Sequence, residues 1–146
     1  MNMKDERQFV GYSKYRSRLV DGHVHTELCP HGSGDRTAMM IEKAIELRIE
    51  KVCLTEHAPL PKAFAVEYGG DQKAYDTASL KLNQVDSYLE LGRQLQRAYG
   101  THIDISLGFE VDYIPGFETD IQEFLDRYGP LTDDNILSVH FMEGVN

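Results

Sequence analysis

The chain has 146 residues, of which 41% are hydrophobic and 27% are charged, enough for one globular domain or part of a larger one. The 24 acidic residues outnumber 15 Lys and Arg residues, giving a formal net charge of −9, which argues against a protein that binds nucleic-acid phosphates. The sequence shows neither an apolar run of roughly eighteen residues nor a signal segment at its start. We therefore expect a cytoplasmic protein that has neither nucleic acid nor membrane as a partner.

The first part of the sequence predicts a strand, a helix and a second strand after a polar extension. Residues 1–17 are polar and show no clear period, so we interpret them as an N-terminal extension. Residues 18–25, RLVDGHVH, alternate as a strand does. Residues 38–50 have apolar side chains at helical spacing, and residues 50–58, EKVCLTEHA, predict the second strand. Together these segments make a βαβ unit.

The remainder alternates in the same way after one long connection. Residues 59–78 mix Pro, Gly and aromatic residues without a period, which is long for a connector, so a functional loop or lid is as consistent with them as a plain turn. A helix is expected over 79–99 and a strand over 102–114. Thr119 is a candidate N-cap for a third helix, and residues 135–142, NILSVHFM, predict a fourth strand.

This order of elements points to parallel strands covered by helices, in either an open doubly wound sheet or a barrel. No GxGxxG or GxxxxGK[ST] pattern follows the first strand, so the usual signature of nucleotide binding is missing and the barrel is favoured. The sequence stops soon after the fourth strand, without a helix to cover it. Because a parallel sheet is normally covered on both faces, we expect a truncated product or an incomplete domain.

Ionisable residues gather at the C-terminal ends of the predicted strands: His23 and His25, Glu56 and His57, Glu110 and Asp112, and His140. Active sites of parallel α/β proteins, barrels above all, are built at this edge. Residues two apart on a strand point to the same side, so His23 and His25 can present two imidazoles to one metal ion. The alternative is a pair of inward polar residues satisfied by hydrogen bonds. The agreement of four strands favours the metal site.

His31 needs a separate interpretation because it lies six residues beyond His25 and after Pro30. It cannot project from the same strand, so we expect it to serve a different cation, with His57 as its partner. Read alone, either histidine is also consistent with a surface residue. Glu56 and His57 point to opposite faces of their strand. We choose His57 as the ligand and leave Glu56 to orient a ligand or to cap the next segment.

Glu110 has a further capacity, because a carboxylate can bridge two cations about 3.5–4 Å apart. Asp112 shares its face parity and is a candidate for a deeper position or for hydrogen bonding to a ligand. An ordinary acidic strand end is the alternative for both. His102 lies at the opposite end of its strand and is left out of the site. Cys29 and Cys53 form neither a disulfide framework nor a CxxC motif.

Four segments of the sequence, DGHVHTELCPHG, LTEHAPLP, GFEVDYIPGFE and SVHF, resemble the PHP superfamily and, within it, the PHP-type histidinol-phosphate phosphatases. The resemblance extends from about residue 18 to the end of the chain, so it implies one PHP domain over 18–146. It implies a distorted (β/α)7 TIM-like barrel, of which this chain would hold about the first four β/α units as a partial barrel. Up to three Zn, Mn or Fe ions are implied at the C-terminal ends of the strands.

The resemblance also implies how the ligands are shared among the metals. It assigns His23, His25 and Glu110 to the first metal, Glu110 and His140 to the second, and His31 and His57 to the third. Cys29 is not a ligand on this comparison, although its spacing does not forbid it. No catalytic side chain is implied, because a metal-bound hydroxide would attack phosphorus while the cations neutralise the phosphoryl oxygens.

The chain departs from the family at its C-terminal side. Family members continue for further strands, which bring more metal ligands and arginines for the substrate phosphate. Without them the second and third metals keep two ligands each, so those sites are expected to be weak. Half a barrel also leaves strand edges uncovered. This predicts self-association or a complementing C-terminal segment.

We expect a metal-dependent phosphomonoester hydrolase that converts the small molecule L-histidinol phosphate and water to L-histidinol and phosphate in histidine biosynthesis. The 146-residue chain itself is expected to be an incomplete fragment, and such a fragment can be inactive on its own. One alternative is another PHP-type phosphoesterase or a 3′-5′ exonuclease, which the acidic charge disfavours. The other alternative is a non-catalytic metal-binding or assembly fragment, which the missing ligands suggest.

Overall fold

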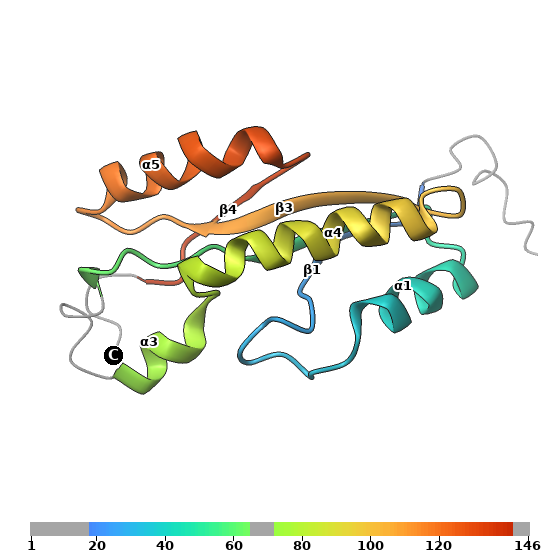
Figure 1. Ribbon diagram of the computed structural model, residues 1–146, viewed down its shortest axis with the longest axis horizontal. Coiled ribbons are helices and arrows are strands. Elements are labelled where there is room, and N and C mark those ends of the chain that lie inside the picture. The colour runs from blue at the N-terminus through green and yellow to red at the C-terminus, as the bar shows by residue number, and fades with distance from the viewer. Residues whose placement is uncertain (1–17, 65–71, 142–146) are drawn as a thin grey trace, which may run out of the picture.

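The computed structural model describes residues 18–64 and 72–141, which form a parallel sheet with packed helices (Figure 1). The strands are β1 (Val20–Val24), β2 (Lys51–His57), β3 (Asp104–Asp112) and β4 (Ile136–Ser138). The α-helices that lie wholly within the described residues are α1 (Thr37–Glu46), α3 (Gln72–Ala78), α4 (Val85–Tyr99) and α5 (Glu118–Tyr128). Two 3₁₀ turns, η1 (Leu82–Gln84) and η2 (Gly129–Leu131), precede α4 and follow α5. The predicted α/β alternation is confirmed.

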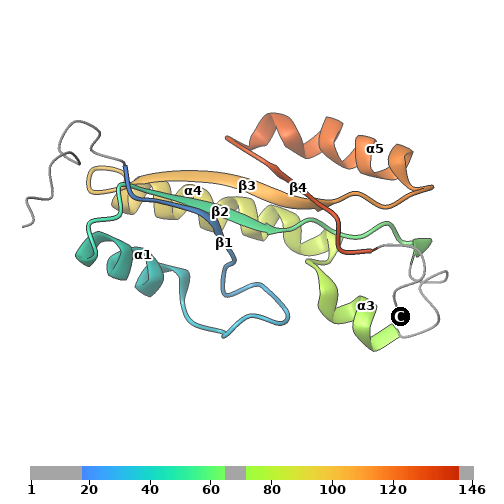
Figure 2. The same cartoon turned by 180° about the vertical axis from the view of Figure 1, so that it is seen from behind.

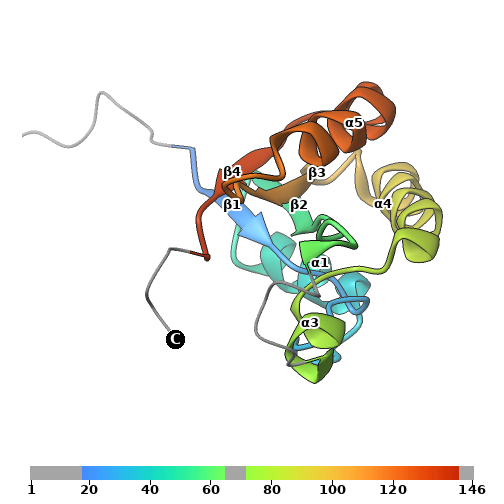
Figure 3. The ribbon, with the colours of Figure 1, turned by 90° about the vertical axis from the view of Figure 1, so that its left-hand side faces the viewer.

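The four strands are parallel and pair in sequence order, β1-β2-β3-β4. The central pair is in register from Lys51 opposite Asp104 to His57 opposite Glu110. Seen from behind and from the side, the strands are open on one face while α1, α4 and α5 lie on the other (Figures 2 and 3). Helices on a single face exclude the doubly wound alternative for the described residues, and they match part of a barrel.

The core lies between the sheet and these three helices. Alternate residues of β2 and β3 point toward the helices, so Leu54, Leu107 and Phe109 are fully buried. Each such side chain stabilises the fold by about 1.5–3 kcal/mol relative to exposure. Tyr88 of α4 is also fully buried. Its hydroxyl lies 2.6 Å from the carbonyl oxygen of Gly108, so α4 is hydrogen-bonded to β3 as well as packed against it.

The segment between α5 and β4 is joined to β3 by side chains as well as by backbone. The Leu107 N–H donates to the Asp133 carboxylate (3.0 Å) and the Phe109 N–H to the Asn135 side-chain oxygen (2.9 Å). The chain passes so close that a Cβ on Gly108 would lie 1.4 Å from the Asp134 carbonyl oxygen. These contacts hold the segment before β4 against β3, so that β4 can pair with β3 from Glu110 onward.

Besides α4, which begins at Val85 rather than at residue 79, two helix ends differ from the sequence expectations. Helix α1 ends at Glu46 rather than at Glu50, because Arg48 adopts a left-handed conformation (φ 59°) and the Ile49 N–H donates back to the Ala44 carbonyl (2.9 Å). Thr119 is not the N-cap of α5, since the helix begins at Glu118 after Phe117. In both cases the neighbouring backbone, and not the expected residue type, sets the boundary.

The connection at 59–78 and the chain ends also differ from the expected pattern. Residues 72–78 of that connection form α3, which the lack of a period did not predict. Strand β4 is shorter than predicted and stops at Ser138, before His140. The predicted extension at 1–17, and the middle of the connection where a lid was considered, lie outside the described residues. Within the part of the chain that is described, no helix has the length and apolar character needed to cross a membrane.

Candidate metal centre

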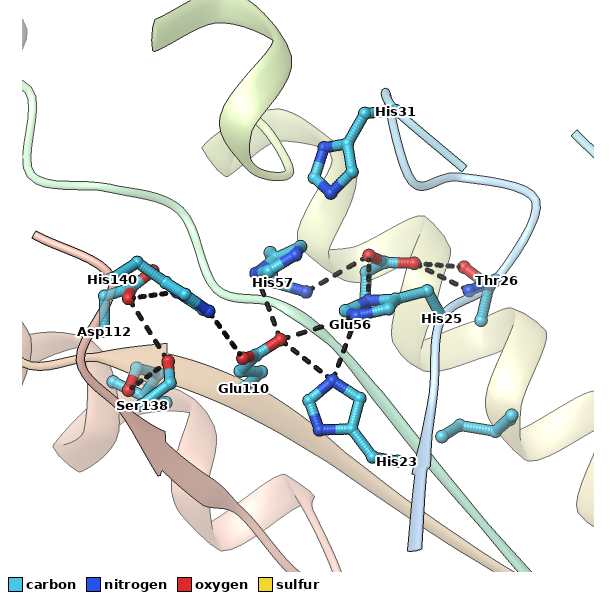
Figure 4. A network of polar contacts seen from close by, with 12 residues as sticks. His23, His25, Thr26, His31, Glu56, His57, Glu110, Asp112, Ser138 and His140 are labelled. Carbon is cyan, nitrogen blue, oxygen red and sulfur yellow. Dashed lines mark hydrogen bonds and ion pairs between the residues drawn. The ribbon is translucent and has the colours of Figure 1, made fainter. Parts of the chain in front are cut away.

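The predicted site residues lie together at the C-terminal edge of the sheet (Figure 4). Parallel topology explains this, because the C-terminal ends of neighbouring parallel strands meet at one edge. The side chains come from β1 and the residue after it (His23, His25), the loop to α1 (His31), the end of β2 (His57), the end of β3 (Glu110, Asp112) and the segment after β4 (His140).

Glu110 lies at the middle of this cluster with only 5% of its side chain exposed. Its Oε2 is 3.1 Å from His23 Nε2, 3.2 Å from His57 Nδ1 and 3.4 Å from His25 Nε2. Its Oε1 is 3.4 Å from His140 Nε2. Among the described residues, Glu110 Oε2 and His57 Nδ1 are buried without a hydrogen-bond partner. Because such atoms are costly, a cation at this point would satisfy both of them.

The imidazole rings pack against one another around this carboxylate. His23 Nε2 and His25 Nε2 are 3.0 Å apart. The rings of His25 and His57 are stacked, with centroids 4.4 Å apart and an interplanar angle of 19°. His31 lies beside His57 at 5.0 Å between centroids, and His140 lies beside it at 5.7 Å. Five imidazole rings are thus gathered close to one another at this edge of the sheet.

Oxygen acceptors hold three of these rings from behind. The Nδ1 atoms of His25, His140 and His31 lie 3.1 Å from Glu56 Oε1, 2.6 Å from Asp112 Oδ1 and 2.7 Å from the Thr77 carbonyl oxygen. Carboxylate and carbonyl oxygens only accept, so each Nδ1 carries the proton. When such a ring is neutral, its Nε2 therefore keeps the lone pair that a cation can bind, as in many metal-binding histidines.

The pKa values of the buried groups follow from these contacts. The hydrogen bond to Glu56 raises the pKa of His25 above its usual value, against the effect of burial. Burial lowers the pKa of His57, although the Glu110 carboxylate opposes this. Burial alone would raise the pKa of Glu56, but hydrogen bonds from His25 and Thr26 outweigh it and the pKa is lowered. Glu56 is therefore ionised at neutral pH and His57 is neutral.

Two groups of donor atoms fit a divalent cation. His23, His25 and Glu110 form one group, and His57, Asp112 and His140 form the other, each with ligand atoms within 4.8 Å of one another. Imidazole with carboxylate suits ions such as zinc, manganese and iron. A third group, His25 with Cys29 and Glu56, meets the same distance limit. It fits less well, because Glu56 already accepts several hydrogen bonds and burial raises the pKa of the Cys29 thiol.

The structure brings all six predicted ligands into one cluster: His23, His25, His31, His57, Glu110 and His140. Their role as metal ligands stays a prediction. His102 lies at the other end of β3, as expected, and contacts Thr101. Sequence reasoning missed Thr26 and the Thr77 carbonyl, which both support the cluster. Nothing in the residue types signals these two contacts, because each depends on how distant segments meet.

Comparisons with known proteins agree with this geometry. The model of the PHP domain matches residues 21–145. The chain is 41% identical over 122 residues to a histidinol-phosphatase of Bacillus subtilis (strain 168). It is similar in structure to a candidate histidinol phosphatase from Listeria monocytogenes (TM-score 0.83, 43% identity). It is also similar to a histidinol phosphate phosphatase from Lactococcus lactis complexed with zinc, L-histidinol and phosphate (TM-score 0.64, 25% identity).

These matches cover most of this chain but less than half of each relative. They cover 84% of the chain and 44% of the Bacillus protein, 86% and 46% for the Listeria structure, and 86% and 41% for the Lactococcus structure. The four parallel strands therefore correspond to part of a TIM-like barrel, as predicted. With the PHP model matched over residues 21–145, which include every residue of the histidine cluster, the chain belongs to the PHP domain family.

Proposed function

We propose that this chain carries part of the metal centre of a phosphomonoester hydrolase that acts on L-histidinol phosphate. The observation that carries the proposal is the buried Glu110 carboxylate, which has ring nitrogens of four histidines within 3.4 Å and, among the described residues, an oxygen without a hydrogen bond. The choice of substrate is supported by the relatives, which are named histidinol-phosphatases. One of them is complexed with zinc, L-histidinol and phosphate.

The ligand assignment we propose uses the six clustered residues. His23, His25 and Glu110 would hold one cation, Glu110 and His140 a second, and His31 and His57 a third. Zinc, manganese and iron are the candidate ions. Divalent cations bound there would polarise the phosphoryl oxygens and supply a water of lowered pKa.

The chain's own residues prepare this chemistry by fixing the imidazoles. Asp112 and the Thr77 carbonyl hold the Nδ1 protons of His140 and His31, so their Nε2 atoms face the cluster. The side chains of His23 and His140 are 41% and 48% exposed, so the cluster is accessible to a small phosphomonoester. Burial of Glu110 lowers the local dielectric, which strengthens its attraction for cations.

The setting we propose is histidine biosynthesis in the cytoplasm. Because the chain spans less than half the length of its relatives, we further propose that full activity needs a second copy or a complementing C-terminal segment. Both edge strands, β1 and β4, pair on one side only within the described residues. Size-exclusion chromatography with light scattering would measure the self-association.

The deciding experiment combines metal analysis with a phosphate-release assay. Zinc- or manganese-loaded protein is expected to release phosphate from L-histidinol phosphate, and Glu110→Ala is expected to abolish the release. Glu90→Ala is the matched control, because Glu90 lies on the exposed side of α4 and, among the described residues, its hydrogen bonds are with Gln94 and Arg97. Release of nucleotides from DNA would instead favour the exonuclease. Metal binding without any turnover would favour the non-catalytic fragment.

A further inference from the structure

We propose that Glu56 is a positioning residue that couples the subsite around His25 to the subsite around His57. The proposal rests on the metal centre proposed above and deepens it, because it assigns a role to a carboxylate that is not itself among the proposed ligands. Glu56 is the last but one residue of β2 and its side chain is fully buried.

The Glu56 carboxylate accepts contacts from three directions. Its Oε1 lies 3.1 Å from His25 Nδ1 and 3.1 Å from the His57 backbone nitrogen. Its Oε2 accepts from the Thr26 backbone N–H (2.8 Å) and from the Thr26 hydroxyl (2.7 Å). Both oxygens are therefore satisfied, in contrast to Oε2 of Glu110. A carboxylate that is already satisfied is a poor ligand but a firm support for other residues.

The contact with His25 selects one tautomer of its ring. An ionised carboxylate only accepts, so the proton of neutral His25 must sit on Nδ1. Free histidine favours the other tautomer, with the proton on Nε2. Glu56 thus turns the Nε2 lone pair toward Glu110, whose Oε2 is 3.4 Å away. Without Glu56, part of the His25 population would face the cluster with an N–H that repels a cation.

The remaining contacts make the same carboxylate a link between two strand ends. Thr26 follows β1 and the two ligands of its HxH pair, and His57 ends β2. The Glu56 carboxylate therefore holds the C-terminal ends of β1 and β2 in place relative to each other. Asp112 offers an internal comparison, because its side chain is hydrogen-bonded to Ser138 and His140 on the β4 side. Asp112 therefore positions one proposed ligand, His140, whereas Glu56 contacts both His25 and His57, whose rings are stacked.

Three carboxylate-to-amide variants of the full 146-residue chain test this assignment: Glu56→Gln, Asp112→Asn and Asp133→Asn. Zinc is titrated into each protein while the ring ¹⁵N signals of His25, His57 and His140 are followed by NMR. Glu56→Gln is expected to raise the zinc concentration needed at His25 and His57 by about 10–100-fold. Asp112→Asn is expected to do so at His140 alone. Asp133→Asn, which lies away from the histidines, lowers stability and leaves all three midpoints unchanged.

A second measurement needs no variant and no metal. In the metal-free wild-type chain at a pH where His25 is neutral, its ¹⁵N shifts are expected to show the proton on Nδ1. Finding the proton on Nε2 overturns the proposal, as does a Glu56→Gln protein whose midpoints at His25 and His57 match those of Asp133→Asn. If the wild-type chain binds no zinc at all, the proposed function fails, while the tautomer measurement still decides the role of Glu56.

Discussion

Two carboxylates beside the same strand, Glu110 and Asp133, have opposite surroundings. Asp133 accepts from the Leu107 N–H (3.0 Å), the Gln96 side-chain amide (2.7 Å) and the Arg93 guanidinium (3.3 Å). Glu110 is surrounded instead by histidine nitrogens, and its Oε2 has no hydrogen bond among the described residues. The first carboxylate is satisfied by the fold, and the second is not.

The difference lies in what the neighbours can do. The groups that face Asp133 are the N–H donors of a backbone amide, a glutamine side chain and a guanidinium, so they complete its hydrogen bonding and offer no lone pair for a cation. Neutral imidazoles can turn a lone pair toward the same point as the Glu110 oxygen. A carboxylate therefore supports the structure at Asp133, whereas at Glu110 we propose that a carboxylate is placed to bind a cation.

The largest expected effects are opposite at the two positions: loss of Glu110 should lower zinc affinity, and loss of Asp133 should lower stability. Glu110→Ala should weaken zinc binding by more than about 100-fold, the upper end for residues that only support a ligand. The stability of the metal-free chain should change little, because within the part of the chain that is described Glu110 Oε2 makes no hydrogen bond that could be lost. Asp133→Ala should leave zinc affinity unchanged and cost about 1–3 kcal/mol of unfolding free energy, since the Leu107 N–H loses its acceptor.

Isothermal titration with zinc and urea unfolding of the metal-free proteins measure these two opposite effects. His140→Ala extends the test, because its Nε2 faces the other Glu110 oxygen. Equal losses of stability in the Glu110 and Asp133 variants, with equal zinc affinities, would show that the comparison is wrong. Zinc affinity is compared per folded molecule, so that a loss of folded protein is not counted as a loss of ligand.

A second prediction concerns Gly108 of β3. It lies between Glu110 and Leu107, whose N–H donates to Asp133. Gly108→Ala should destabilise the protein by about 3 kcal/mol or more, because the new Cβ would lie 1.4 Å from the Asp134 carbonyl oxygen. Backbone atoms cannot move aside as a flexible side chain can. The segment that carries Asp133 would therefore be displaced from β3, and urea unfolding would measure the loss.

Gly22→Ala is the matched control for this substitution. Gly22 is also a strand glycine, and nothing lies within 4 Å of the position of its Cβ. We expect its stability to change by less than about 1 kcal/mol. A Gly108→Ala protein as stable as Gly22→Ala would contradict the close approach of the 133–135 segment to β3.

The sequence predicted the site better than the contacts that hold it. Local periodicity predicted the strands and which side chains share a face, as for the HxH pair and for Glu110 with Asp112. These side chains lie at the expected C-terminal edge of the sheet. His31 also lies beside His57, as its place after Pro30 suggested. Periodicity is a property of a single segment, so it can be read without knowing the fold.

The features that the sequence did not predict depend on contacts between segments that are distant in the sequence. The Thr26–Glu56 bonds join residues 30 positions apart, and the Asp133–Leu107 bond joins residues 26 apart. The early end of α1 depends on a left-handed Arg48, which residue type disfavours. Such features come from tertiary packing, which overrides local preference without leaving a pattern in one sequence.

The smallest expected effect separates charge from hydrogen bonding at Asp133. Burial alone would raise its pKa, but hydrogen bonds from the Leu107 N–H, Gln96 and Arg93 outweigh this and hold the pKa below its usual value. A carboxyl with a lowered folded-state pKa adds stability above its unfolded pKa and loses it as the pH falls through the folded value. Because 38% of the side chain is exposed, solvent screens the gain to under about 1 kcal/mol. Wild-type protein should therefore lose stability more steeply than Asp133→Asn as the pH falls from about 5 to 3, measured by urea unfolding across that range. Parallel curves would mean that Asp133 acts only through the geometry of its hydrogen bonds, and that its charge adds nothing to the contrast with Glu110.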